Sequence, residues 1–383
     1  MQILGRINEM DMNNLVKTSY SSDDVTILLK DLSGCIEALD TETREKLIQS
    51  GVHYSEMLPL EYEPTDKYME IYNKSLEEMS ERTADSILTL CDSLYKRHNG
   101  QRFVIISLAR AGTPIGILTK RFMKMKYNID CPHYSISIIR GKGIDENAME
   151  YIYKTMSNTI GVKYFQFLDG WTGKGAINKQ LTDAVNRLKL KDKKWDDLDA
   201  DLAVLADPAN ICTTCGTHDD FLIPSACLNG TVSGLVSRTI LNDKFVDINK
   251  GDFHGAVYFD KLEPVDKSIE FTDKVTNILQ KIINNNINKC NTCTSDTGLD
   301  IVNGIANTFG IGDINMIKPG VGETTRVLLR RVPWKVLINT NIDGTIGMEH
   351  ILQLCKEKNI PVEEYNMGNY RACGIIRNLS ADV

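Results

Sequence analysis

No stretch of the sequence is apolar enough to cross a membrane, because none approaches the roughly 18 consecutive apolar residues that a spanning helix needs. The first residues lack a basic start followed by an apolar core, which argues against a signal peptide. An excess of positive charge is also absent, since the formal net charge is −7. Any contact with nucleic acid must therefore come from a local basic patch. We expect a cytoplasmic protein with no membrane partner.

A dense disulfide framework is absent too, although the chain has ten cysteines. The pairs Cys212–Cys215 and Cys290–Cys293 lie much farther apart than the two halves of a zinc ribbon, which are separated by about 15–20 residues. We therefore favour no metal at either pair. We expect reduced thiols that are mostly buried in apolar contexts, as at Cys35, Cys91, Cys131, Cys355 and Cys373.

The length of 383 residues indicates two or three domains. A polar, apolar-poor stretch near residues 284–298 predicts a linker, and a new alternation of helix and strand patterns follows it. We expect a mixed and helical N-terminal extension over 1–100, a parallel-sheet domain over 101–265, a helix and linker over 266–299, and a small α/β domain over 300–383.

Four short apolar runs, mostly followed by a loop and a helix, predict a parallel α/β sheet. Because parallel crossovers are right-handed, the loops after these strands collect along one edge, which is where such folds bind ligands. A long helix is expected to begin near Lys67, with Thr65 as its cap, and to end at Gly100. The predicted strands are Arg102–Leu108, Tyr134–Ile139, Tyr164–Leu168 and Asp201–Ala206.

Two of the loops after these strands have the composition of a phosphate site. In Ser107–Gly116, Gly112 allows close approach of the backbone, and Arg110 offers a bidentate contact to phosphate. In Asp169–Gly175, an acid at a strand end precedes a glycine-rich turn and a helix start. This turn is not a Walker A loop, because Leu168 occupies the position of its first glycine.

The acid-x-x-Thr-Gly pattern resembles the PRPP-binding motif of type I phosphoribosyltransferases, and SLARAGTPIG resembles their pyrophosphate loop. The chain also resembles a bacterial family linked to tellurite-resistance and stress operons, through YSISIIRGKGID, FLDGWTGKGAI and DDFLIPSACLNGTVSGLVSRTI. This family is known under both a phosphoribosyltransferase name and the name cysteine protease StiP. The resemblance implies a type I phosphoribosyltransferase-like sheet domain that transfers a phosphorylated ribose to an unknown base with Mg²⁺.

Carried over to this sequence, the resemblance assigns roles to both loops and to the glycine-rich segment between them. The usual motif has two adjacent acids, whereas here Asp169 is followed by Gly170, so Asp207 is expected to supply the missing contact. The resemblance places Arg110, Ala111, Gly112 and Thr113 at the pyrophosphate, Asp169 at the ribose and Mg²⁺, Thr172, Gly173, Lys174 and Gly175 at the 5′-phosphate, and Arg140 and Lys142 over the site.

Two other functions stay open. The protease name would require a nucleophile, for which Cys227 is the candidate, with His254 as base and Asp219 or Asp220 as its orienting group. A lone cysteine between Ala and Leu is more often a small buried hydrophobe. The missing second acid favours a non-catalytic nucleotide- or RNA-binding protein. Assembly into a homo-oligomer is also left open. The histidines His53, His98, His133, His218 and His350 receive no role.

The C-terminal segment from Lys318 to Gly374 resembles the Pelota and kink-turn RNA-binding fold. Residues 316–335 are locally basic within an acidic chain, which suits contact with the phosphates of a structured RNA. The alternative is a plain solvated helix face, as charged runs usually are. The resemblance implies RNA contacts from Gly322, Glu323, Thr324 and Arg326, supported by Arg330 and Arg331.

Overall fold

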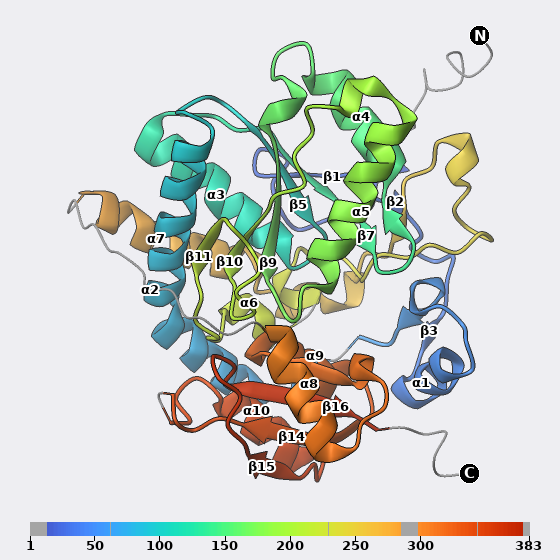
Figure 1. Ribbon diagram of the computed structural model, residues 1–383, viewed down its shortest axis with the longest axis vertical. Helices are drawn as coiled ribbons and strands as arrows, with labels where there is room; N and C mark the ends of the chain where they lie inside the picture. Colours follow the sequence, from blue (N-terminus) through green and yellow to red (C-terminus); the bar gives the residue numbers. More distant parts are fainter. Residues whose placement is uncertain (1–13, 62, 229, 285–297, 343, 378–383) are drawn as a thin grey trace.

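The computed structural model describes residues 14–61, 63–228, 230–284, 298–342 and 344–377. A parallel α/β domain is joined by a smaller C-terminal domain that packs against it (Figure 1). In this described part of the chain, no helix is long and apolar enough to span a bilayer. Residues 285–297 of the predicted linker, with the pair Cys290–Cys293, lie outside the described residues.

A six-stranded parallel sheet forms the centre of the larger domain, in the order β1-β6-β5-β9-β10-β11. The four strands predicted from apolar runs are its inner members, which confirms the parallel α/β class. The edge strands β1 and β11 escape the sequence pattern, because they have only two and three residues. The bounds are β1 (Thr26–Ile27), β5 (Val104–Leu108), β6 (His133–Ile136), β9 (Phe165–Trp171), β10 (Leu202–Ala206) and β11 (Cys215–Thr217).

Helices cover both faces of this sheet, as a parallel sheet requires. Alternate strand residues enter different cores: Ile105 and Leu205 face one layer, whereas Ile106 and Val204 face the other. This period of two follows from the pleat of a strand. The first layer contains α2 (Asp66–Arg97), α3 (Gly112–Tyr127) and α7 (Ser268–Asn284), and the second contains α4 (Glu146–Met156) and α5 (Ala176–Lys191).

The long helix α2 has the ends that the sequence predicts. The Thr65 hydroxyl accepts a hydrogen bond from the Tyr68 N–H at 3.3 Å, which caps the first turn. The chain leaves the helix through Asn99 and Gly100, whose φ angles are 51° and 68°. Glycine adopts this left-handed conformation without strain.

Shorter elements surround the sheet and connect the layers. Three two-stranded pairs and two further helices lie outside the main sheet. They are β2 (Lys30–Asp31) with β12 (Gly255–Ala256), β3 (Ala38–Leu39) with β4 (Leu58–Pro59), β7 (Ile138–Ile139) with β8 (Gly143–Ile144), α1 (Thr41–Gln49) and α6 (Pro224–Cys227).

The C-terminal domain is a four-stranded mixed sheet with helices, which agrees with the expected small α/β unit. Its strand order is β13-β16-β14-β15, and only β14 and β15 pair in parallel. The boundaries proposed between the domains of the chain stay predictions. The elements are α8 (Gly298–Phe309), β13 (Ile317–Pro319), α9 (Val321–Arg330), β14 (Pro333–Ile338), α10 (Glu349–Glu357), β15 (Val362–Glu364) and β16 (Ala372–Ile376).

The two domains share a core and a buried polar contact. Val321 and Leu328 of α9 pack in the same apolar cluster as Leu76 of α2. The carboxylate of Asp220, which follows β11, accepts hydrogen bonds from the N–H of Val321 at 2.9 Å and of Arg371 at 2.8 Å. Burial raises the pKa of Asp220 to about 6. The C-terminal domain is therefore docked through its backbone onto one side chain of the sheet domain.

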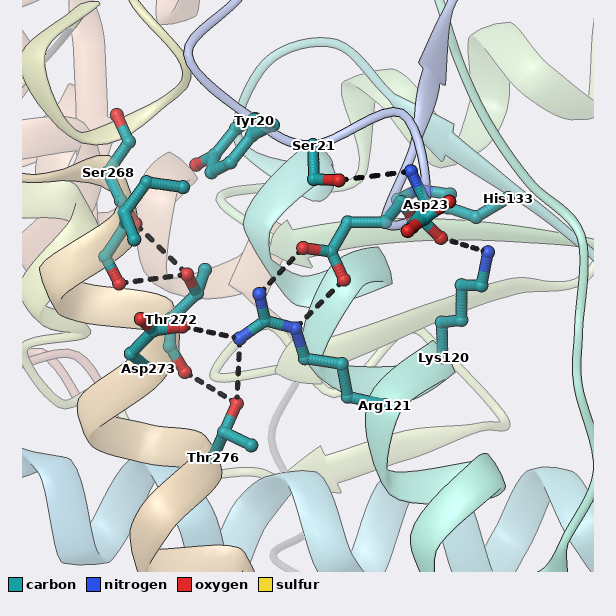
Figure 2. Close-up of polar contacts among 12 residues, drawn as sticks. Tyr20, Ser21, Asp23, Lys120, Arg121, His133, Ser268, Thr272, Asp273 and Thr276 are labelled. Carbon is teal, nitrogen blue, oxygen red and sulfur yellow. Dashed lines mark hydrogen bonds and ion pairs between the residues drawn. The ribbon is translucent and has the colours of Figure 1, made fainter.

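Arg121 of α3 joins the N-terminal segment to α7 (Figure 2). Its guanidinium binds both carboxylate oxygens of Asp24 at 2.8 and 2.6 Å, and it binds Asp273 at 2.8 Å. We expect Arg121→Met to lower the free energy of unfolding by about 2 kcal/mol, because Asp24 would stay largely buried without its counter-ion. Urea unfolding with an unchanged slope would measure this loss.

The matched control for Arg121 is Lys179→Met on α5. Lys179 pairs with Asp183 at 3.1 Å, but its side chain is 79% exposed. An exposed pair of this kind contributes little. Equal effects of the two substitutions would contradict the structural role of Arg121.

His350 of α10 predicts a pH effect on stability. Burial lowers its pKa to about 3, and its Nε2 lies 2.8 Å from the Thr325 hydroxyl. The unfolded chain therefore takes up a proton first, and this histidine destabilises the fold as pH falls below its unfolded value of about 6.5. When the pH falls from 7.5 to 5.0, we expect the free energy of unfolding of His350→Gln to rise by about 2 kcal/mol relative to that of the wild type. A pH-independent difference, measured by urea unfolding, would refute this.

Candidate functional site

Three groups suited to nucleophilic chemistry meet at the end of β10 and around β11. Asp207 directly follows β10, Cys215 begins β11, and His218 follows it. The chain between the strands folds around the buried Asp207 carboxylate, which accepts the N–H groups of Ile211 and Cys212 at 2.8 Å each. Pairing of the two strands then brings the three side chains together.

The distances define a chain of contacts from thiol to imidazole to aspartate. Cys215 Sγ lies 3.5 Å from His218 Nε2. His218 Nδ1 lies 3.1 Å from the Asp207 carbonyl oxygen and 3.6 Å from its carboxylate Oδ2. The carbonyl can only accept, so Nδ1 carries the proton and Nε2 is left to accept the thiol proton. A cysteine, a base within reach and a group that orients the base are the parts of an activated nucleophile.

The same three residues could instead hold a metal ion, because their ligand atoms all lie within 4.8 Å of one another. Thiolate, imidazole and carboxylate are the donors that zinc takes in proteins. Cys212, the other member of the Cys-x-x-Cys pair, does not belong to this group. The two cysteines of the Cys-x-x-Cys pair are therefore not both part of this possible metal site.

The structure does not bring the expected nucleophile and base together. Cys227 is fully buried on α6, and burial raises the pKa of its thiol to about 12. His254 contacts the Ser137 hydroxyl at 2.8 Å, and its backbone N–H donates to Asp145. Asp219 pairs with Arg82 at 2.9 Å. Cys227 is thus packed as a small hydrophobe, because it lies between apolar neighbours in the main core.

The other thiols mostly follow the sequence expectation. Cys91, Cys131, Cys355 and Cys373 are buried, which confirms four of the five predictions. Cys35 is exposed instead, beside the turn at Gly34.

The two predicted phosphate loops lie side by side, since a Cβ on Gly170 would lie 3.1 Å from the Ala111 carbonyl oxygen, but only the second loop lines the large cavity. The turn Thr172–Gly175 lines a large cavity together with Asp169 and Arg140. Burial raises the pKa of Asp169 to about 6. Arg110 does not line this cavity among the residues described, because it donates to the Val236 carbonyl at 2.8 Å.

The remaining residues of these predictions also have structural explanations. A Cβ on Gly112 would lie 2.6 Å from the Leu168 carbonyl, so glycine allows α3 to pack on β9. Lys142 is exposed. Asp207 lies with Cys215 and His218 and does not line the cavity. The loop residues Ala111 and Thr113 are half-buried and buried, respectively.

The residues expected to contact RNA are buried or half-buried. A Cβ on Gly322 would lie 2.5 Å from the Trp171 ring, and the buried Thr324 hydroxyl donates to Gly320 O at 2.8 Å. Arg330 is half-buried, and its Nη2 lies 3.5 Å from the Glu61 carboxylate. Glu323 and Arg326, which are paired at 2.9 Å, line the cavity between the domains together with Arg331. This face of α9 is therefore an interdomain surface.

Sequence reasoning left His218 without a role and treated Cys215 only as half of a Cys-x-x-Cys pair. The signal that could have identified them is the sequence Cys215-Gly-Thr-His218, eight residues after the acid Asp207 that follows a predicted strand. A three-residue strand hides this signal, because it is too short to show an alternating pattern.

Comparison with known proteins adds independent findings. Residues 18–276 match the family model described as tellurite-like stress resistance cysteine protease StiP, and residues 296–378 match the Pelota RNA-binding domain. The chain is 34% identical over 374 residues to a protein of Acinetobacter baylyi named cysteine protease StiP, with 94% of each chain covered. No solved structure matches.

These matches correct the expected phosphoribosyltransferase activity. The family and the relative both carry the name of a cysteine protease, so the transferase reading of the two loops is wrong. The two loops suggested a transferase because glycine-rich turns after parallel strands occur in many unrelated sites. The Mg²⁺ expected at Asp169 stays an untested prediction. By its sequence over nearly its whole length, the chain belongs to the StiP family.

Proposed function

We propose that this protein is a cysteine peptidase in which Cys215 is the nucleophile, His218 the general base and Asp207 the group that orients the base. The observation that carries this proposal is the 3.5 Å contact between Cys215 Sγ and His218 Nε2. The name of the A. baylyi relative, cysteine protease StiP, supports the reaction class.

The reaction follows from this contact. His218 Nε2 takes the proton of the Cys215 thiol, and the thiolate attacks the carbonyl carbon of a peptide bond. The tetrahedral intermediate collapses, the C–N bond breaks, and the imidazolium returns its proton to the leaving amine. Water then attacks the thioester while Nε2 takes one of its protons. Release of the carboxylic acid restores the thiol.

Asp207 acts through His218. Its carbonyl accepts the Nδ1–H, which fixes the tautomer that leaves Nε2 unprotonated. Its carboxylate lies 3.6 Å from Nδ1 and favours the imidazolium formed during the reaction. The Thr172 hydroxyl also donates to this carboxylate, so the loop after β9 helps to hold the site.

Alkylation tests this assignment. With limiting iodoacetamide, we expect Cys215 to react before Cys227 and peptide hydrolysis to fall in step with labelling of Cys215, as measured by peptide mapping. Cys227 should react only in denaturant, because it is fully buried. Full labelling of Cys215 with unchanged hydrolysis would refute the proposal. Loss of hydrolysis on chelation alone would assign the three residues to a metal instead.

A second candidate function is RNA binding by the C-terminal domain, which the Pelota match over residues 296–378 supports. Of the expected contacts, Arg326 is the least covered, with 38% of its side chain exposed. A gel-shift assay with a structured RNA should show affinity that falls steeply with salt and falls further in Arg326→Gln. Binding that is insensitive to salt would count against this function.

A further inference from the structure

A cavity of about 590 Å³ lies between the two domains. Its walls come from α1, from the loop between β9 and α5, and from the C-terminal domain around α9. In Figure 1, α1 lies beside the C-terminal domain, and the hydrogen bond from Arg44 Nη1 to the Arg330 carbonyl joins them. Sites for small organic ligands have volumes of roughly 300–1,000 Å³. The cavity can therefore hold a molecule of nucleotide size.

The lining of this cavity is strongly cationic although the whole chain is acidic. Seven arginine and lysine side chains face four carboxylates, an excess of three positive charges. Two of those carboxylates are already paired, Glu45 with Arg331 at 2.6 Å and Glu323 with Arg326 at 2.9 Å. In the described part of the chain, the other five cations donate no hydrogen bond to a carboxylate. They are Arg44, Arg140, Lys174, Arg238 and Lys318. Such a concentration of positive charge attracts an anion.

Arg44 is the clearest sign of an incomplete site. Its side chain lines the cavity, the residue is only 1% exposed, and its Nε and Nη2 have no hydrogen-bond partner among the described residues. Burial and the nearby charges of Arg330 and Arg331 lower its pKa to about 10. A buried guanidinium facing like charges is unfavourable unless an anion completes its contacts.

Two further features converge on the same space. The guanidinium carbon of Arg238 lies 4.4 Å from the centre of the Tyr54 ring. Burial and, to a lesser extent, the charge of Arg44 lower the pKa of Arg238 to about 10. Helix α5 begins at the cavity after Gly175, and no side chain in the described part of the chain caps its first turn. Its free N–H groups and the helix dipole favour negative charge there.

From this juxtaposition, we propose that the interdomain cavity binds a small organic ligand carrying a di- or triphosphate, such as a nucleoside triphosphate. The guanidiniums of Arg44 and Arg238 and the start of α5 would contact its phosphate oxygens. Arginine suits this role because its fork matches two phosphate oxygens. Because the ligand would touch both domains, it would hold them together. This binding is separate from the proposed peptidase reaction.

The test uses the full-length protein with ATP, pyrophosphate and a short 5′-hydroxyl RNA as probes. Calorimetric titration at fixed ionic strength should show binding of ATP and pyrophosphate. Saturating ATP should raise the melting temperature by at least about 2 °C, because a ligand that binds only the folded state stabilises it.

Arg44→Met is the decisive variant. It should weaken ATP binding at least tenfold while leaving the melting temperature of the unliganded protein unchanged or higher, because it removes a buried charged group whose Nε and Nη2 lack hydrogen-bond partners among the described residues. If this variant does not fold, Arg140→Gln at the cavity edge provides the same comparison. Lys142→Gln is the matched control, since Lys142 is exposed on the same loop and outside the cavity lining.

Binding of ATP and pyrophosphate that is lost in Arg44→Met and kept in Lys142→Gln supports the proposal. Absence of binding by both phosphate probes overturns it, as does equal affinity in Arg44→Met. Binding of the RNA alone, with loss in Arg44→Met, also overturns it and assigns the cavity to a nucleic-acid backbone. None of these outcomes depends on peptide hydrolysis.

Discussion

Cys215→Ser should lower kcat/KM for peptide hydrolysis by about a thousandfold or more, since removal of a nucleophile that acts with its base abolishes most of the rate enhancement. A serine hydroxyl can occupy the position of the thiol, but His218 Nε2 removes its proton far less readily. The expected loss lies in kcat, because the thiolate acts only once substrate is bound. Steady-state kinetics on a fluorogenic peptide mixture would measure it.

Two other cysteines provide controls for this loss. Cys35→Ser changes an exposed thiol without a described role, and Cys227→Ala changes the fully buried thiol of α6. Both variants should retain activity within about threefold, although Cys227→Ala should be less stable by about 1 kcal/mol because it leaves a small void. Should Cys227→Ala abolish hydrolysis while Cys215→Ser retains it, the nucleophile has been placed on the wrong residue.

Asp220→Ala should lower the free energy of unfolding by about 3 kcal/mol, because two backbone N–H groups of the C-terminal domain lose their shared buried acceptor. The carboxylate lies 2.9 Å from the Val321 nitrogen and 2.8 Å from the Arg371 nitrogen. The amides of these two residues should also exchange faster with solvent. Chemical unfolding and hydrogen exchange together measure the effect.

The neighbouring aspartate makes a matched control. The side chain of Asp219 is 62% exposed and pairs with Arg82 on α2. Asp219→Ala should cost no more than about 1 kcal/mol, as expected for a surface ion pair. If the two substitutions destabilise the protein equally, docking does not depend on the buried carboxylate.

The inner strands and long helices could be predicted because their signals are local. Val104–Leu108 and Leu202–Ala206 are uninterrupted apolar runs that only a sheet covered on both faces can bury. The ends of α2 were likewise indicated by Thr65 and Gly100. Strands β1 and β11 have no comparable signal, because backbone pairing with a neighbour defines them.

The candidate site was only partly accessible from the sequence. Asp207 was selected as a strand-end acid, but for contact with a ribose. Its partners could not be assigned, because the turn after β10 brings Cys215 back beside it, and only the pairing of β11 fixes that return. The buried Cys227 shows the converse: its apolar sequence neighbours favoured a core thiol over a nucleophile, and its place in the main core agrees with that.

The sequence by itself determined the α/β class, the positions of the main strands and helices, and the existence of a small C-terminal α/β unit, because these depend on hydrophobic patterns within short segments. Only the tertiary structure decided which cysteine meets a histidine, and that α9 turns its expected RNA face toward the sheet domain. These contacts join residues far apart along the chain or across a turn, and packing of the whole fold sets their distances.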